Sequence, residues 1–369
     1  MQSTTKFIGL DVSKEKIAVA VAEAGREEPR WYGTIPHTAE ALRKLIKQLG
    51  DKETLAFCYE AGPTGYEAYR WITSMGAQCC VIAPTLIPKR AGDRIKTDRR
   101  DALQLARLFR AGELTSIYVP TREDEALRDL RARSDAREDL HGARQRLIKF
   151  LLRHQIHPPV TIKRRWTQKY RNWLDTLKFE TQPAHQAMWK EYKYAVHEAE
   201  QRQKRLESAI MEEASKGAKA SVIHVLQSLR GIALLTAVTI AAEIGSFERF
   251  RSPAQLMAYL GLVPREHSSG QTVRRGSMTK AGNSHLRRAI VEASWSYRYS
   301  PAVKGELAER LDGQSAEVQA ISWKAQERLH GKYKRLVYGK GRPANVAIGA
   351  VARELTGFIW AVARTLEDA

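Results

Sequence analysis

The first 83 residues alternate short apolar runs with helix and turn patterns, and this order constrains the fold more than any other feature. Strand-like runs lie at 6–12, 16–23, near 31–35, at 54–60 and at 79–83. Apolar residues at helical spacing fill 37–49, and a helix follows the turn at 62–65 up to about Met75. This βββαβαβ order with a further helix predicts an α/β layer architecture.

Long charged helices are predicted next, one at 123–156 that Pro158-Pro159 ends and one at 183–215. The second has heptad spacing, which is typical of a coiled-coil hairpin or dimer seam, although a plain helical bundle fits equally well. Beyond Lys219 the pattern is mainly helical. Residues 228–232 resemble a helix-hairpin-helix turn, which binds phosphate through backbone N–H groups, and a buried helix is the alternative. We therefore predict domains at 1–120, 121–218 and 219–369.

The 369 residues carry a net charge of +20, and more than half of it lies in one stretch. Residues 249–342 hold 18 basic and 7 acidic side chains, whereas residues 1–120 have a net charge of only +4. A basic excess on this scale indicates nucleic acid as the partner, through phosphate neutralisation. A basic but inert surface would spread the charge more evenly.

Other classes of protein are excluded by what the sequence lacks. Cys58, Cys79 and Cys80 form no CxxC pair, so a zinc knuckle or a disulfide framework is not expected. No signal peptide is recognisable at the start, and the apolar stretch 232–242 is too short to span a bilayer. We expect a cytoplasmic protein with no membrane partner.

Four carboxylates stand out as a candidate metal site. Asp11 and Glu60 lie at the ends of two predicted strands, and Asp98 and Asp101 stand at i and i+3 on one helix face. Hard cations such as Mg²⁺ prefer carboxylate oxygens, and two ions about 3.5–4 Å apart can act on one phosphoester. Each residue alone also fits an ordinary role, such as a turn or a helix first turn.

The segments FIGLDVSKEKIAVAV, YEAGPTGYEAYRW and KTDRRDALQLARL, in that order, resemble the DEDD-type RuvC-like domain of a transposase family. This is the insertion-sequence family numbered one hundred and ten. The long segment from LRGIALL to VEASW is similar to the family's C-terminal transposase domain. The resemblance covers roughly residues 5–300, and residues 301–342 are a candidate insertion.

The resemblance implies a ribonuclease-H-like first domain, a central coiled coil that mediates dimerisation and a mainly α-helical C-terminal domain. It implies a recombinase in which Asp11, Glu60, Asp98 and Asp101 bind Mg²⁺ as two ions, with Mn²⁺ as a substitute. A structured RNA, the bridge RNA, would pair with donor and target DNA. The family pattern P-x4-SG assigns the nucleophile to Ser269 rather than Ser268. The active site would be composite, in a dimer or a dimer of dimers.

Basic residues around these motifs are candidates for nucleic-acid contact. A stretch at 163–173 interleaves cations and aromatic rings, which favours RNA contact by phosphate pairing and base stacking. Asn283 and Lys280 fit phosphate or base contact, or a helix cap, and Arg287 and Arg288 fit backbone contact. The candidate residues are Lys163, Arg164, Arg165, Trp166, Arg274, Arg275, Lys280, Asn283, Arg287 and Arg288.

Three other functions remain as alternatives. A metal-dependent junction nuclease would use the same first domain with water as the nucleophile. A non-catalytic nucleic-acid-binding protein would need none of the carboxylates. An actin-like kinase is suggested only by GLDVSKEK, and the basic excess argues against it.

Overall fold

The computed structural model describes residues 5–88, 97–129, 132–179, 182–269 and 272–366. It divides into two compact units, of which the first ends at Val119 and the second begins at Pro120. Each unit is described by itself below.

The first unit is built on a mixed five-stranded sheet in the order β3–β2–β1–β4–β5. The central strand β1 pairs antiparallel with β2 and parallel with β4. The strands are β1 (Lys6–Val12), β2 (Lys16–Glu23), β3 (Arg30–Pro36), β4 (Leu55–Glu60) and β5 (Gln78–Ile82). Each begins and ends within one residue of its predicted run, so the predicted α/β architecture is confirmed and is consistent with a ribonuclease-H-like fold.

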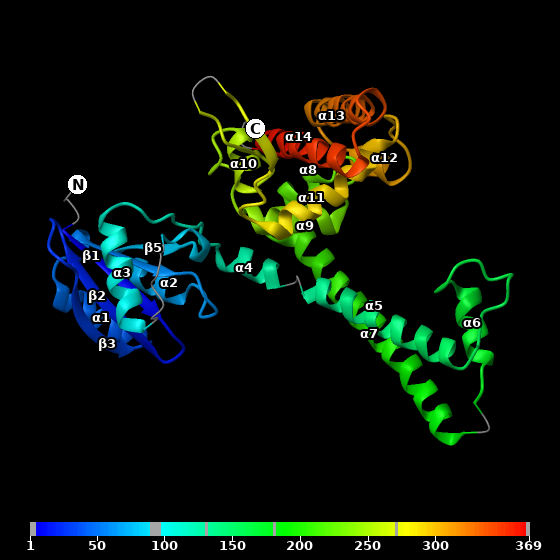
Figure 1. Cartoon of the computed structure of the whole chain (residues 1–369), viewed down its shortest axis with the longest axis horizontal. Helices are drawn as coiled ribbons and strands as arrows, with labels where there is room; N and C mark the ends of the chain where they lie inside the picture. Colours follow the sequence, from blue (N-terminus) through cyan, green and yellow to red (C-terminus); the bar gives the residue numbers. More distant parts are fainter. Residues whose placement is uncertain (1–4, 89–96, 130–131, 180–181, 270–271, 367–369) are drawn as a thin grey trace. The chain divides into compact units, whose positions relative to one another are not determined.

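Helices cover both faces of this sheet (Figure 1). Ile8 and Leu10 of β1 pack with residues of α1 (Ala39–Leu49) and α2 (Glu67–Ser74) on one face. The alanines of β2 pack against Ala102 and Ala106 of α3 (Asp98–Arg110) on the other. Strands buried on both faces read as continuous apolar runs, which is why 16–23 is almost wholly apolar.

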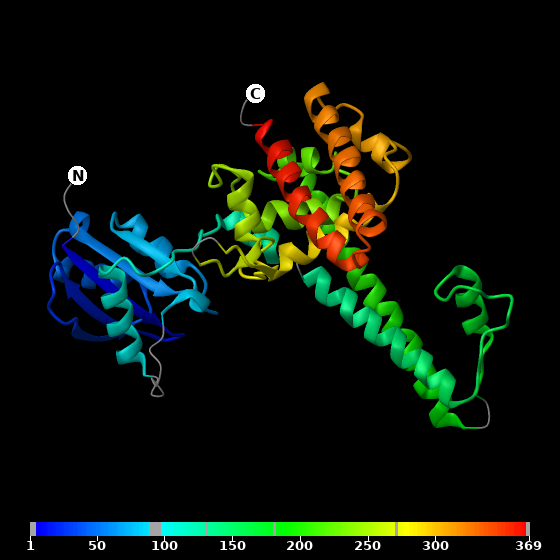
Figure 2. The same ribbon diagram turned by 45° about the horizontal axis from the view of Figure 1, so that its top comes forward.

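The second unit begins with a long helical hairpin. It contains α4 (Arg122–Asp129), α5 (Ala132–Arg153), α6 (Gln168–Thr176) and α7 (Pro183–Lys216). Helices α5 and α7 lie side by side in both views (Figures 1 and 2). Trp189, Val196 and Ile210 of the heptad stripe are buried. The stripe therefore packs within the chain, as the hairpin alternative requires.

The predicted helix at 123–156 extends too far. Helix α5 ends at Arg153, and Gln155 adopts a φ of 56°, which an α-helix does not accommodate. Residues 130 and 131, between α4 and α5, lie outside the described part of the chain. A continuous helix through them stays a prediction.

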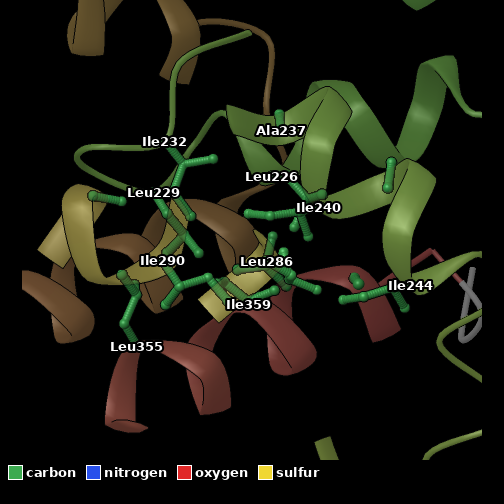
Figure 3. Close-up of a cluster of buried hydrophobic side chains, with 14 of the residues drawn as sticks. Leu226, Leu229, Ile232, Ala237, Ile240, Ile244, Leu286, Ile290, Leu355 and Ile359 are labelled. Carbon is green, nitrogen blue, oxygen red and sulfur yellow. The ribbon is translucent and has the colours of Figure 1, made fainter. Parts of the chain in front are cut away.

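The rest of the second unit is helical apart from one short hairpin. Its elements are α8 (Ala220–Leu226), α9 (Leu234–Ile244), α10 (Pro253–Tyr259), β6 (Pro264–Glu266), β7 (Arg275–Met278), α11 (Ser284–Ser294), α12 (Glu306–Leu311), α13 (Ala316–Lys334) and α14 (Ala344–Arg364). Short helical turns lie at Lys52–Thr54 and Pro84–Leu86 in the first unit, and at Trp295–Arg298 and Arg335–Gly339 in the second. Figure 3 shows the core, in which Ile240, Leu286 and Ile359 come together from α9, α11 and α14.

The turn at 228–232 belongs to this core. Leu229 and Ile232 are buried, and a Cβ at Gly231 would lie 2.4 Å from the carbonyl oxygen of Ala293. The Arg230 guanidinium donates to the carbonyl of Ser300 at 2.8 Å. These contacts favour the buried alternative over a phosphate-binding helix-hairpin-helix turn.

Helix α14 is long and apolar enough to cross a membrane by length and composition alone. Val351, Leu355 and Ile359 of this helix are fully buried within the second unit. Packing inside the core therefore accounts for its composition.

Candidate active site

Two of the predicted carboxylates stand at the same edge of the sheet. Strands β1 and β4 run parallel, with Gly9 opposite Cys58 and Leu10 opposite Tyr59. One residue further along, the same register brings Asp11 of β1 opposite Glu60, the last residue of β4. Parallel strands present their carboxyl ends at one edge, and this is where polar site residues gather in α/β sheets.

Helix α3 lies unusually close to β1 because position 9 has no side chain. A Cβ at Gly9 would lie 2.4 Å from both the carbonyl oxygen of Ala102 and the amide nitrogen of Ala106. Residues two apart on a strand point to the same face. Asp11 therefore belongs to the face that α3 covers.

Glu60 belongs to this face as well. The Cys58 thiol donates to the carbonyl of Leu105 in α3, with a sulfur–oxygen distance of 3.8 Å. Glu60 follows Cys58 by two residues along β4, so it shares the same side of the sheet. Its side chain is exposed, whereas that of Asp11 is half-buried.

The direction of α3 places its first turn at this edge. Lys16, at the start of β2, lies 3.6 Å from the carboxylate of Asp98, and Arg110 at the far end of α3 donates to the carbonyl of Glu23. The Thr97 hydroxyl accepts from the Arg100 amide and begins the helix there. Asp98 and Asp101 therefore lie beside the strand ends that carry Asp11 and Glu60.

The four carboxylates share an edge and a face without forming a closed metal cluster. No group of three or more His, Cys, Asp or Glu side chains is close enough to hold a metal ion within the described ranges. The donor set itself fits a divalent cation, since carboxylate oxygens are hard ligands. A bound cation would offset the mutual repulsion of the four negative charges.

The predicted nucleophile lies near the tip of the β6–β7 hairpin. Ser269 forms a two-way backbone pair with Thr272, with both N–H to O distances at 3.1 Å, and it is exposed. The Ser268 hydroxyl instead donates to the carboxylate of Glu266 at 2.8 Å. The two adjacent serines therefore differ, since the Ser268 hydroxyl is bonded to a carboxylate two residues earlier, at the end of β6.

Two glycines lock the base of this hairpin. A Cβ at Gly261 would lie 2.0 Å from the carbonyl oxygen of Ala281, and one at Gly282 would lie 2.0 Å from that of Tyr259. Their φ angles of 63° and 82° also favour glycine. The chain before β6 and the chain after β7 thus cross in direct backbone contact, which fixes where the hairpin emerges.

Asn283 and Arg287 both make hydrogen bonds within the fold. The Asn283 side chain caps α11 by accepting from Leu286 N at 3.0 Å and donates to Glu243 at 2.8 Å. Arg287 donates to the carbonyl of Leu260 at 2.9 Å. The helix-cap alternative is confirmed for Asn283, and nucleic-acid contact by Asn283 and Arg287 stays a prediction.

The other cations of this region are differently placed. Arg274 and Lys280 are exposed around the hairpin, and Arg288 is exposed on α11 with a neighbouring Glu292 at 3.1 Å. The side chain of Arg275 lies outside the described part of the structure. Three of the side chains predicted to contact nucleic acid, Arg274, Lys280 and Arg288, are therefore exposed to solvent.

The basic stretch at 163–173 keeps most of its cations exposed, whereas its aromatic side chains are half-buried or buried. Lys163, Arg164 and Arg165 are exposed. Trp166 is half-buried, with the Arg144 guanidinium 4.8 Å from its ring centroid, and Tyr170 is 1% exposed. Base stacking on Tyr170 is therefore excluded, and phosphate pairing by the three cations is what this surface offers.

Comparison with known proteins gives the family. A profile described as "Transposase" for the DEDD enzymes of the IS110 group matches residues 8–156, and one described as "Transposase IS116/IS110/IS902 family" matches residues 223–305. A Sinorhizobium fredii protein described as "Putative transposase y4qE" is 47% identical over 97% of this chain and 88% of its own length.

The chain belongs to the IS110 family of transposases. The transposase for insertion sequence element IS1533 of Leptospira borgpetersenii is 34% identical over 89% of this chain and 96% of its own length. The pilin gene-inverting protein of Moraxella bovis is 28% identical over 77% of this chain and 80% of its own. The protein is accordingly an enzyme of DNA phosphoryl transfer whose DEDD domain implies a divalent metal.

Sequence reasoning missed the residues that position this site. Gly9 sets the approach of α3, and Gly261 with Gly282 sets the hairpin base. A glycine inside a buried strand is a recognisable signal for close backbone approach. The partner backbone, about 95 residues away in the case of Gly9, is not encoded in any local pattern.

Proposed function

We propose that this IS110-family transposase recombines DNA through a covalent link to Ser269, with donor and target chosen by a bridge RNA. The observation that carries the proposal is the different use of two exposed hydroxyls: that of Ser268 donates to Glu266, whereas no hydrogen bond within the described residues engages that of Ser269. The Ser269 oxygen would bond to phosphorus as the bond from phosphorus to one deoxyribose oxygen breaks. The departing oxygen takes up a proton, and the serine ester keeps the strand ready for rejoining.

We assign the metal ligands to Asp11, Glu60, Asp98 and Asp101, which share one edge and one face of the sheet. Bound Mg²⁺, or Mn²⁺ in its place, would neutralise charge on the phosphate. The carboxylates would orient the cation, and exposed Arg274 and Lys280 would bind phosphates near Ser269. The two halves would act together in a dimer or a dimer of dimers, in the cytoplasm.

The deciding experiment uses cognate DNA and RNA with Mg²⁺. We expect a DNA–protein adduct that is lost in Ser269→Ala and kept in Ser268→Ala. Cleavage that persists in Ser269→Ala without an adduct would favour a junction nuclease with water as nucleophile. Full activity in Asp11→Asn and Glu60→Gln would refute the metal assignment.

RNA contact is assigned to Lys163, Arg164 and Arg165, which are exposed and adjacent. Reversal of all three to Glu should weaken RNA binding. It should also reduce the salt dependence of binding, because fewer phosphate contacts form and fewer counterions are released. Lys190→Glu with Lys204→Glu, two exposed positions on α7, serves as the charge control. Unchanged RNA affinity in the triple variant would refute this assignment.

A further inference from the structure

The connection between α13 and α14 carries a concentration of positive charge that the proposed function does not use. Residues 328–353 contain seven Lys and Arg and no Asp or Glu. This stretch lies beyond residues 223–305, where the C-terminal family profile matches. Its residues 328–342 also belong to the candidate insertion at 301–342.

Only part of this charge is neutralised within the fold. Arg328 and Lys332 both pair with Glu354 of α14, at 3.2 and 2.6 Å. The cations at the connection itself are exposed, and no carboxylate in the described part of the chain pairs with them. They are Lys334, Arg335, Lys340 and Arg342.

An aromatic ring stands among these cations. Tyr338 is 76% exposed, and its ring meets the buried Tyr333 edge-on with centroids 6.4 Å apart. The edge contact anchors the ring while most of its surface faces solvent. A single exposed ring is ordinary on a protein surface, and it is the neighbouring cations that make Tyr338 a candidate stacking platform.

Backbone hydrogen bonds and helical turns give the connection between α13 and α14 a defined conformation. Helix α13 passes into a π-turn at Arg335–Gly339, and the Arg342 amide donates to the Leu336 carbonyl at 2.9 Å. Gly341 has a φ of 60°, which permits the sharp return into α14. Single π-turns at helix ends often occur at functional sites.

We propose that residues 334–342, the α13–α14 turn, bind a single-stranded segment of nucleic acid. The four cations would pair with successive phosphates, and a base would stack on Tyr338. Duplex bases are already stacked on each other, so the ring selects unpaired strands. The proposal rests on the proposed function only in taking nucleic acid as the ligand class.

Photo-crosslinking tests the placement in the full-length protein. Single-stranded 20-nucleotide probes, one of DNA and one of RNA, each carry 5-iodouracil and are irradiated with the protein. We expect a crosslinked peptide that contains Tyr338, and the probe that gives it identifies DNA or RNA as the source. Crosslinks confined to other peptides with both probes would overturn the proposal.

Affinity measurements test the chemistry. By fluorescence anisotropy, Tyr338→Ala should weaken binding of the preferred strand about 5-fold or more, and Tyr338→Phe should restore it. Lys340→Ala with Arg342→Ala should lower the slope of log affinity against log salt by roughly 1.4, since each single-strand phosphate contributes about 0.7. Tyr194→Ala, at another exposed tyrosine, is the matched control and should have no effect.

The outcomes are separable from the proposed reaction. Ser269→Ala should bind these probes normally even though it forms no adduct. Equal losses in Tyr338→Ala and Tyr194→Ala, or equal losses with duplex and single strands, would overturn the assignment of the α13–α14 turn.

Discussion

At the scale of single residues, Gly9 controls the candidate active site from the strand beneath α3. In Gly9→Ala the new Cβ would overlap backbone atoms of Ala102 and Ala106, which cannot rotate away as a side chain would. Helix α3 must then move off β1 and carry Asp98 and Asp101 with it. We expect a loss of about 2 kcal/mol or more in the stability of the first unit, together with loss of metal-dependent cleavage. Thermal unfolding and cleavage assays measure the two effects.

Gly62→Ala is the matched control in the same unit. Its Cβ would meet nothing closer than the Glu60 carbonyl oxygen at 3.9 Å, an ordinary contact. It should unfold and cleave like the wild type. A Gly9→Ala protein with normal activity would show that the close approach of α3 is not needed to bring the carboxylates together.

Asn283 gives a second prediction at this scale. Asn283→Ala removes the cap of α11 and one hydrogen-bond donor to the buried Glu243. We expect about 1–2 kcal/mol of destabilisation, measured by denaturant unfolding. The folded variant should keep its nucleic-acid affinity and salt dependence. Weaker nucleic-acid binding by the folded variant would instead place Asn283 on the nucleic-acid surface.

These residues mark where prediction from the sequence ends. Asp11 and Glu60 could be predicted because strand ends are recognisable from local apolar runs. The scaffold role of Arg287 could not, because its partner is the carbonyl of Leu260, 27 residues earlier in the chain. A polar side chain beside a basic motif looks the same whether it binds a ligand or the protein's own backbone.

At the scale of elements, one carboxylate joins α6 to both helices of the long hairpin. Glu200 of α7 accepts from Arg171 of α6 at 2.8 Å and from Arg144 of α5 at 2.7 Å. Arg144 then lies over the ring of Trp166, which adopts a φ of 64° directly after the exposed cations. Glu200 thus supports the segment proposed to bind RNA.

This arrangement predicts a pH dependence for α6 docking. Burial alone would raise the pKa of Glu200, but hydrogen bonds from Arg171 and Arg144 hold that pKa below its ordinary value. Because the pKa of Glu200 is lower in the folded protein than in the unfolded chain, its ionised form stabilises the folded state. This stabilisation is fully present above the unfolded-state pKa and is lost as the pH falls through the folded-state pKa. We expect the protection of amides in 168–176, taken relative to the intrinsic exchange rate at each pH, to stay constant at pH 5–7 and to fall only in strong acid.

Glu200→Gln checks the cause of this dependence. It should speed up exchange in α6 already at pH 7 and remove the acid transition. Lys193→Ala, which breaks an outlying ion pair with Asp175 of α6, is the control and should change exchange little. An unaltered acid transition in Glu200→Gln would contradict this explanation.

Elements with regular periodicity were predicted from the sequence, and irregular ones were not. Helix α7 was predicted to within a residue at each end because its apolar spacing is sustained over many turns. Helix α6 was missed, since its buried Tyr170 and Leu174 are too few to form a visible stripe. The contact between Arg171 and Glu200 adds to their packing, and no periodic pattern reveals it.

At the scale of the whole molecule, the chain is two units joined at Val119 and Pro120. Helix α4 opens the second unit and fastens to the end of α9, where the last carbonyls have no partner within the helix. Arg128 donates to the Ala242 carbonyl at 2.9 Å, and Lys219 donates to that of Gly245 at 2.6 Å. Helix α4 therefore packs as part of the second unit.

Asp124 of α4 makes this fastening depend on Lys219. Its carboxylate is 0% exposed, no hydrogen bond from the described part of the chain reaches either oxygen, and the Lys219 ammonium is 3.4 Å away. Lys219→Met would leave the carboxylate buried without a counter-charge, which costs roughly 2 kcal/mol or more. Calorimetry should show two unfolding transitions, with only that of the second unit lowered.

Asp124→Asn combined with Lys219→Met should recover part of the lost stability, because a neutral amide is cheaper to bury than an unpaired charge. A lowered transition for the first unit, or no recovery in the double variant, would contradict this role for the pair.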